Sequence, residues 1–186
     1  AFRSLQIKVV KGFMKEGDTI TVRFGVKAHG GPGMGLQTFC EDRYEFRVLV
    51  DPIATYNFQT LLEQPAISIV SGKPENWVAV VPSTIASSEP FALKIKAEDT
   101  WGNPTNQATT VLTPKSNQPI ENLPDSITVK SGDFASVVPG LKVNGDGPLE
   151  IALHAADGSI VTTCNPAVVA ESPQLKSYWG DLHGQS

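Results

Sequence analysis

The chain has 186 residues, of which 40% are apolar and 18% are charged, and its formal net charge is -4. This length and apolar content suffice for one or two domains with packed cores. Because it has neither a concentrated run of Lys and Arg nor an apolar stretch of roughly 18–20 residues, we expect a soluble protein without nucleic-acid partners and without a membrane span.

Apolar side chains alternate with polar ones along four stretches of the chain. This period of two is typical of strands with one buried face, and antiparallel sheets produce it more often than buried parallel sheets do. Only residues 57–64 suggest one or two helical turns. In chain order, the predicted strands contain Ile20, Val22 and Phe24; Tyr44, Phe46 and Val48; Phe91, Leu93, Ile95 and Ala97; and Leu149, Ile151 and Leu153.

Turn-forming residues separate these stretches, and 16 Gly and 14 Pro leave little room for long helices. Short strands at this spacing predict an all-β fold of tandem immunoglobulin-like β-sandwich domains with antiparallel sheets. We place a boundary near Ser71-Gly72-Lys73-Pro74. The predicted organisation is a first β domain over residues 1–72, which need not be complete, a sandwich over 73–170 and an exit segment over 171–186.

The first predicted domain contains a Gly-rich loop over residues 25–35, including Gly30-Gly31-Pro32-Gly33-Met34-Gly35. A phosphate-binding loop would lead into a helix and carry a Lys at a fixed spacing, and no Lys follows here. We interpret it as a surface loop, with docking inside a larger parent protein as the alternative.

The two cysteines, Cys40 and Cys164, are far apart in the sequence. They lack the close spacing of a disulfide framework, although a single disulfide between them is an alternative. We predict two buried free thiols, which favours a reducing compartment.

The segment Asp99-Thr100-Trp101-Gly102-Asn103-Pro104 follows the predicted strand at Phe91. Trp101 could serve as a stacking platform for a carbohydrate. The favoured interpretation is that Trp101 packs over the end of its own sandwich, because one aromatic residue beside a turn is not specific. His29 and His154 have no partner at metal-ligand spacing, and we interpret both as ordinary histidines.

The last residues carry the clearest chemical motif. If residues 181–186 continue as a strand, Asp181, His183 and Gln185 project to one side. A catalytic metal usually needs three or more protein ligands and an open position. His183 and Gln185 are therefore predicted as an incomplete metal site, and the alternative is a tail whose aromatic residues fill a groove on the second domain.

The sequence Tyr178-Trp179-Gly180-Asp181-Leu182-His183-Gly184-Gln185-Ser186 resembles the beginning of a catalytic domain in a family of large bacterial proteins of unknown function. The main domain of that family is similar to the PHP (polymerase and histidinol phosphatase) metal-dependent hydrolases. Residues 17–22, 37–39, 48–52 and 90–104 are similar to the region before that domain.

The resemblance implies an Asp-Leu-His-x-His strand that places two histidines on metals. His183 matches the first histidine, and Gln185 stands where the second would be, which puts direct ligation there in doubt. The resemblance also implies a bacterial source, a divalent metal in the parent protein and the parent's own catalytic domain as partner. No other catalytic residue of the family can be transferred to this chain.

We therefore expect a non-catalytic accessory β region that supports or orients the catalytic domain of a metal-dependent hydrolase and holds no cofactor itself. A carbohydrate- or surface-binding β-sandwich module is the alternative, motivated by Trp77, Trp101 and Trp179. An enzyme in its own right ranks last because no complete catalytic constellation is present. Fold alone does not separate these functions.

Overall fold

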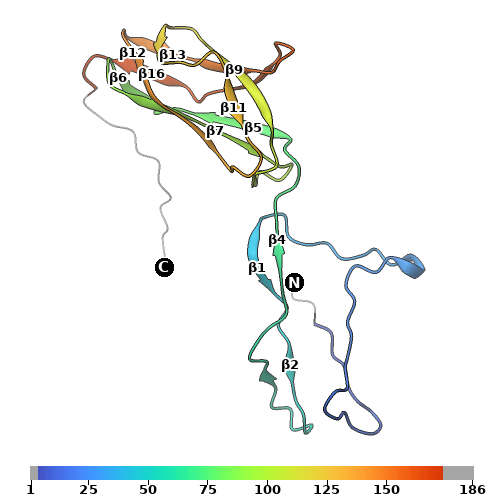
Figure 1. Ribbon diagram of the computed structural model, residues 1–186. Coiled ribbons are helices and arrows are strands. Elements are labelled where there is room, and N and C mark those ends of the chain that lie inside the picture. The colour runs from blue at the N-terminus through green and yellow to red at the C-terminus, as the bar shows by residue number, and fades with distance from the viewer. Residues whose placement is uncertain (1–3, 174–186) are drawn as a thin grey trace. The chain divides into compact units, whose positions relative to one another are not determined.

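The computed structural model describes residues 4–173. Regular structure in these residues is almost entirely β, with sixteen strands and the short 3-10 helix η1 (Ala28–Gly30) (Figure 1). The predicted all-β class is confirmed. Contacts divide the chain into two compact units, residues 1–37 and residues 38–186. The domain boundary placed near residue 72 stays a prediction.

Most of the second unit is a β-sandwich between Ser71 and Ala170. Its first sheet has the spatial order β10-β12-β7-β5, in which all neighbours are antiparallel, and a short strand β8 also pairs with β7. The bounds are β5 (Asn76–Val80), β7 (Phe91–Glu98), β8 (Pro104–Thr105), β10 (Ile120–Glu121) and β12 (Ser136–Val143).

The facing strands form a four-stranded ladder in the order β11-β9-β14-β15 and a three-stranded ladder in the order β13-β16-β6. Only the β6–β16 pair is parallel among the described pairs. The bounds are β6 (Thr84–Ala86), β9 (Thr110–Ser116), β11 (Ile127–Val129), β13 (Gly147–Leu149), β14 (Ile151–His154), β15 (Ile160–Thr163) and β16 (Ala167–Ala170).

This strand order is that of an immunoglobulin-like sandwich. The order β5-β7-β12-β10 corresponds to strands A-B-E-D, and β9-β14-β15 corresponds to C-F-G. The two sheets bury their inward side chains against each other, as sheets about 10 Å apart do. The strand order alone therefore identifies this region as an immunoglobulin-like sandwich.

Two of the predicted alternating stretches contribute to the core. On β7, Leu93 and Ile95 are fully buried, while Lys94 between them is exposed. Opposite them, Ile151 and Leu153 on β14 are also fully buried. The alternation on β7 confirms the predicted strand at Phe91.

Two of the predicted strands differ from the structure. The stretch at Tyr44, Phe46 and Val48 does not contribute to the core: none of the three is buried, and Phe46 and Val48 lie beyond the end of the strand at Glu45. The strand predicted over Leu149, Ile151 and Leu153 is divided, because β13 ends at Leu149 and β14, in a different ladder, begins at Ile151.

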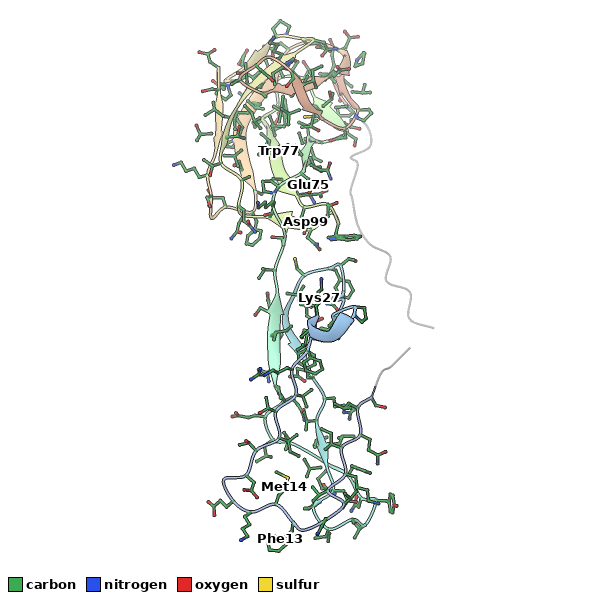
Figure 2. All side chains as sticks on the ribbon, turned by 90° about the vertical axis from the view of Figure 1, so that its right-hand side faces the viewer. Phe13, Met14, Lys27, Glu75, Trp77 and Asp99 are labelled. Atoms are coloured by element: carbon green, nitrogen blue, oxygen red, sulfur yellow. The ribbon has the colours of Figure 1, made fainter. Side chains whose placement is uncertain are left out.

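Residues 4–27, in the first unit, contain no strand. The strand predicted at Ile20, Val22 and Phe24 is therefore wrong, because an alternating pattern alone does not create the ladder of backbone hydrogen bonds that defines a strand. A tight turn does form: the Lys15 N–H donates to Asp18 Oδ2 at 2.8 Å, and the Asp18 N–H donates to the Lys15 carbonyl at 3.0 Å. Figure 2 labels Phe13 and Met14 next to this turn.

Residues 38–70 form two short antiparallel strand pairs, the second of which lies between the strands of the first in the sequence. Strand β1 (Glu41–Glu45) pairs with β4 (Ala66–Ile69), and β2 (Leu49–Val50) pairs with β3 (Gln59–Thr60). The helical turns predicted over residues 57–64 are therefore wrong. The turn between β2 and β3 is held by Asp51 instead, which accepts the N–H groups of Thr55 at 3.1 Å and Tyr56 at 2.7 Å.

Candidate functional site

The turn that follows β7 is built around a buried carboxylate. Asp99 is 3% exposed. Its Oδ1 accepts hydrogen bonds from the N–H groups of Trp101 at 2.9 Å and Asn103 at 3.0 Å. The side-chain Nδ2 of Asn103 donates to both carboxylate oxygens, at 3.1 and 3.0 Å. Asp99 therefore closes the turn from inside, which is the usual role of Asp in such turns.

The same carboxylate holds the segment through which the chain reaches the sandwich. The Gly72 N–H donates to Asp99 Oδ2 at 2.9 Å, and the Gly72 carbonyl accepts from Thr105 Oγ1 at 2.8 Å. The Ser71 carbonyl accepts from Gln107 Nε2 at 2.9 Å. Consecutive backbone groups are thus fixed by side chains from the sandwich. We call the four side chains that hold this junction the junction clamp: Asp99, Asn103, Thr105 and Gln107.

Asn103 also contacts the segment that precedes β1, within the same compact unit. Its Nδ2 donates to the Thr38 carbonyl at 2.8 Å, and its Oδ1 accepts from the Cys40 N–H at 3.2 Å. One amide side chain therefore joins the Asp99 turn to residues about 65 positions earlier in the sequence. Figure 2 labels Asp99 together with Glu75, whose N–H donates to the Glu98 carbonyl at 2.8 Å.

Hydrogen bonding lowers the pKa of Asp99 to about 2. The Gly72 N–H makes the largest contribution, and the Asn103 side chain the next largest; burial acts in the opposite direction and is outweighed. At neutral pH the carboxylate is ionised and its oxygens accept from these donors. A general base or metal ligand must direct a lone pair at its target, so the arrangement makes Asp99 a structural anion.

Trp101 lies in the same turn and is 67% exposed. The interpretation that it packs over the end of its own sandwich is therefore wrong. Its backbone N–H is held by Asp99, while most of its indole is in contact with solvent. An exposed aromatic face can stack on a flat apolar surface of a ligand. Trp77, in contrast, is half-buried and packs against the core.

The two predicted metal ligands lie outside the part of the chain that the structure describes. His183 and Gln185 lie outside residues 4–173, and so does Trp179. Among the residues that are described, no group of three or more His, Cys, Asp or Glu side chains could hold a metal ion. His154 ends β14, and its Nδ1 lies 3.0 Å from the Gly158 carbonyl, so it takes part in the turn before β15.

The two cysteines have different environments. Both are free; Cys164 is buried and Cys40 is exposed. The prediction of a buried thiol is confirmed for Cys164 and wrong for Cys40. Burial raises the pKa of the Cys164 thiol to about 11, which keeps this thiol protonated and unreactive.

The junction clamp was missed by the sequence analysis, which recognised only the Gly-Asn-Pro turn. The spacing of Asp99 four residues before Asn103, with a Gly between them, was the available signal, because Asp readily accepts turn N–H groups. No local pattern pairs Thr105 with Gly72 or Gln107 with Ser71, since these bonds join residues 33 and 36 positions apart.

No family profile matches the chain. An uncharacterized protein of Chlamydia muridarum (strain MoPn / Nigg) is 28% identical over 184 residues, covering 93% of this chain and 28% of that protein. An uncharacterized protein of Chlamydia trachomatis serovar D (strain ATCC VR-885 / DSM 19411 / UW-3/Cx) is 26% identical over 182 residues, with the same two coverages. The chain thus spans little more than a quarter of these curated relatives.

Among solved structures, the D00-D0 domain of Intimin aligns with 70% of this chain and 65% of that chain, at 12% identity and a TM-score of 0.38. A similarity at this level bears on neither function nor partners. In the part of the chain that the structure describes, no helix combines the length and the apolar character needed to cross a bilayer.

Proposed function

We propose that the chain is a non-catalytic β module of a longer protein, in which the sandwich holds the segments that precede it. The junction clamp is the observation that carries this proposal. Its side chains bind the backbone of Ser71, Gly72, Thr38 and Cys40. The most strongly hydrogen-bonded carboxylate of the sandwich is thus engaged in fixing a chain junction.

NMR relaxation of residues 38–40 and 71–72 tests this proposal. Asn103→Ala removes the donor to Thr38 and the acceptor for Cys40, so their backbone order parameters should fall from about 0.85 toward 0.6 or lower. Asn144→Ala is the matched control, because Asn144 bonds to Ser88 and Glu121 instead. Unchanged order parameters in Asn103→Ala would show that the clamp does not hold the junction.

A finer proposal is that the supported partner is a PHP-like metal-dependent hydrolase domain. The Asp181-Leu182-His183 motif motivates it. Residues 1–186 are assayed for phosphoester and carboxyester hydrolysis with added manganese, zinc or iron. We expect no turnover; turnover that disappears in His183→Ala would contradict a non-catalytic chain.

The second candidate function is binding of carbohydrates or of another surface, and the exposure of Trp101 favours it. Stacking on an aromatic face needs the ring and not the indole N–H. Binding on a glycan array should therefore be lost in Trp101→Ala and partly kept in Trp101→Phe. The absence of glycan binding by the unmodified chain would reject this candidate and leave the junction proposal untouched.

A further inference from the structure

Two stretches of the chain, residues 15–30 and residues 130–145, align with each other without a gap. They share identical residues along their whole length. The identical pairs are Lys15 and Lys130, Gly17 and Gly132, Asp18 and Asp133, Val22 and Val137, Gly25 and Gly140, Lys27 and Lys142, and Gly30 and Gly145. Similarity of a sequence to itself at a fixed spacing is the signature of a repeated structural unit.

The same turn begins both stretches. The Asp18 N–H donates to the Lys15 carbonyl at 3.0 Å, and the Asp133 N–H donates to the Lys130 carbonyl at 3.3 Å. The glycine that precedes each aspartate has a positive φ, +91° in the first stretch and +102° in the second. Sequence and backbone geometry therefore agree at this turn.

A second glycine adopts the same conformation further along both stretches. Gly25 has a φ of +71°, and Gly140 has a φ of +72°. Gly140 lies where the register of β12 on β7 shifts, and a glycine in the left-handed region is typical of such a β-bulge. The stretches differ in that residues 136–143 form β12, whereas residues 21–27 contain no strand.

The segments that follow the two stretches have the same strand order. In the sandwich, β13 pairs with β16, and β14 pairs with β15 between them in the sequence. In residues 41–69, β1 pairs with β4, and β2 pairs with β3 between them. A Pro precedes the last strand of each set, and the residue after it pairs with the last residue of the first strand, Ala66 with Glu45 and Ala167 with Leu149.

An aspartate holds the turn between the inner strands in both sets. Asp51 does so before β3, as described above, and Asp157 Oδ1 accepts from the Ser159 N–H at 2.9 Å and from the Ser159 hydroxyl at 2.6 Å before β15. The glycine turn, the second glycine, the aspartate turn and the Pro thus occur in the same order twice. Equivalent positions are about 100–115 residues apart, which is close to the length of one immunoglobulin-like domain.

In the sandwich these elements are the E, F and G strands, because β12 corresponds to E, β13 with β14 to F, and β15 with β16 to G. We infer that residues 15–69 are the E, F and G strands of a second immunoglobulin-like domain. The partner of the junction clamp is then that domain, a step that rests on the proposed function. The clamp holds residues 38–40 inside the repeat and residues 71–72 just after it.

Amide hydrogen exchange of the full-length protein, read by mass spectrometry, tests the inference through the two equivalent glycines. Gly25→Ala forces a side chain into the left-handed region and should accelerate exchange about tenfold in residues 19–26 and in residues 41–69 together, because one domain opens as a unit. The amides of β7 and β14 should keep their rates. Gly140→Ala should accelerate β7 and β14 instead and leave residues 41–69 unchanged.

Two further variants show that the effect comes from the repeated backbone conformation. Asn tolerates a positive φ better than Ala does, so Gly25→Asn should accelerate exchange less than Gly25→Ala. Gly35→Ala is the matched control, because Gly35 lies between the repeated elements and is not among the glycines with a positive φ. It should change neither set of amides.

Three results would overturn the inference. Acceleration by Gly25→Ala that does not reach residues 41–69 would mean that the two segments do not belong to one domain. Acceleration of β7 and β14 by Gly25→Ala, or of residues 41–69 by Gly140→Ala, would mean that the repeat is part of the sandwich itself. The proposed function fails separately, since unchanged order parameters in Asn103→Ala would reject the clamp and leave this exchange pattern intact.

Discussion

Residues 71–170 and residues 4–70 share an alternating sequence pattern but differ in burial. Every buried apolar residue that the structure describes lies between Ala79 and Val169. In residues 4–70, no residue for which the structure describes the exposure is buried. The comparison teaches that alternation specifies which face of a strand is apolar, whereas burial depends on packing that face against another sheet, as the sandwich does.

The largest effect expected from this comparison is on the core. Leu93→Ala should lower the free energy of unfolding by about 2–5 kcal/mol, because it leaves a cavity beneath a fully buried side chain. Val22→Ala, in a segment that has no core, should change it by less than about 0.5 kcal/mol. Urea unfolding followed by fluorescence measures both. Equal losses for the two variants would remove the distinction between the regions.

A smaller effect is expected at the junction clamp. Asp99→Ala leaves the N–H groups of Gly72 and Trp101 without their acceptor, and we expect the thermal midpoint of the sandwich to fall by about 4–8 °C. Asp18→Ala is the control, because Asp18 also accepts a backbone N–H but lies in the region without a core. Calorimetry should detect no change in the control.

Acid should weaken the sandwich through the same carboxylate. The pKa of Asp99 in the folded chain is about 2, below its ordinary value of 3.8. Its contribution to stability is therefore complete above about pH 4 and is lost as the pH falls through 2. The pKa of Asp157 is also lowered, first by the Ser159 hydroxyl and then by the Ser159 N–H. As the pH falls from 5 to 1.5, the thermal midpoint of unfolding should decrease, and it should decrease less steeply in Asp99→Asn than in the unmodified chain.

The smallest effect is expected at Trp101. Because its indole is mostly exposed, Trp101→Ala should change the free energy of unfolding by less than about 0.5 kcal/mol. Trp77→Ala removes a half-buried ring that packs against the core and should cost more, about 2–3 kcal/mol. If Trp101→Ala lowered the free energy of unfolding as much as Trp77→Ala, the indole of Trp101 would have to pack against the sandwich.

The strands of the sandwich could be predicted because the sequence patterns that specify them, alternation and turn residues, are local. Strand β7 alternates between Leu93 and Ile95 on one side and Lys94 and Lys96 on the other, and the turns around it contain Gly, Asn and Pro. Period two and turn chemistry are sufficient to predict such an element. The predicted strand at Ile20 failed because the same local pattern says nothing about whether a partner strand is present.

The candidate site was less predictable because its contacts are not local. Asp99 and Asn103 stand close together in the sequence, and their turn could be recognised. Their bonds to Gly72 and Thr38 join segments 27 and 65 positions apart, and these depend on how the sheets fold. The exposure of Trp101 was mispredicted for a related reason, since a turn sequence does not fix the direction of its side chains.

Limited proteolysis of residues 1–186 followed by mass spectrometry tests most directly whether the sandwich is the stable unit of the chain. We expect early cleavage within residues 4–70 and a resistant product that spans about residues 71–170, because cleavage follows local opening. A resistant product that retains residues 4–70 would contradict this account.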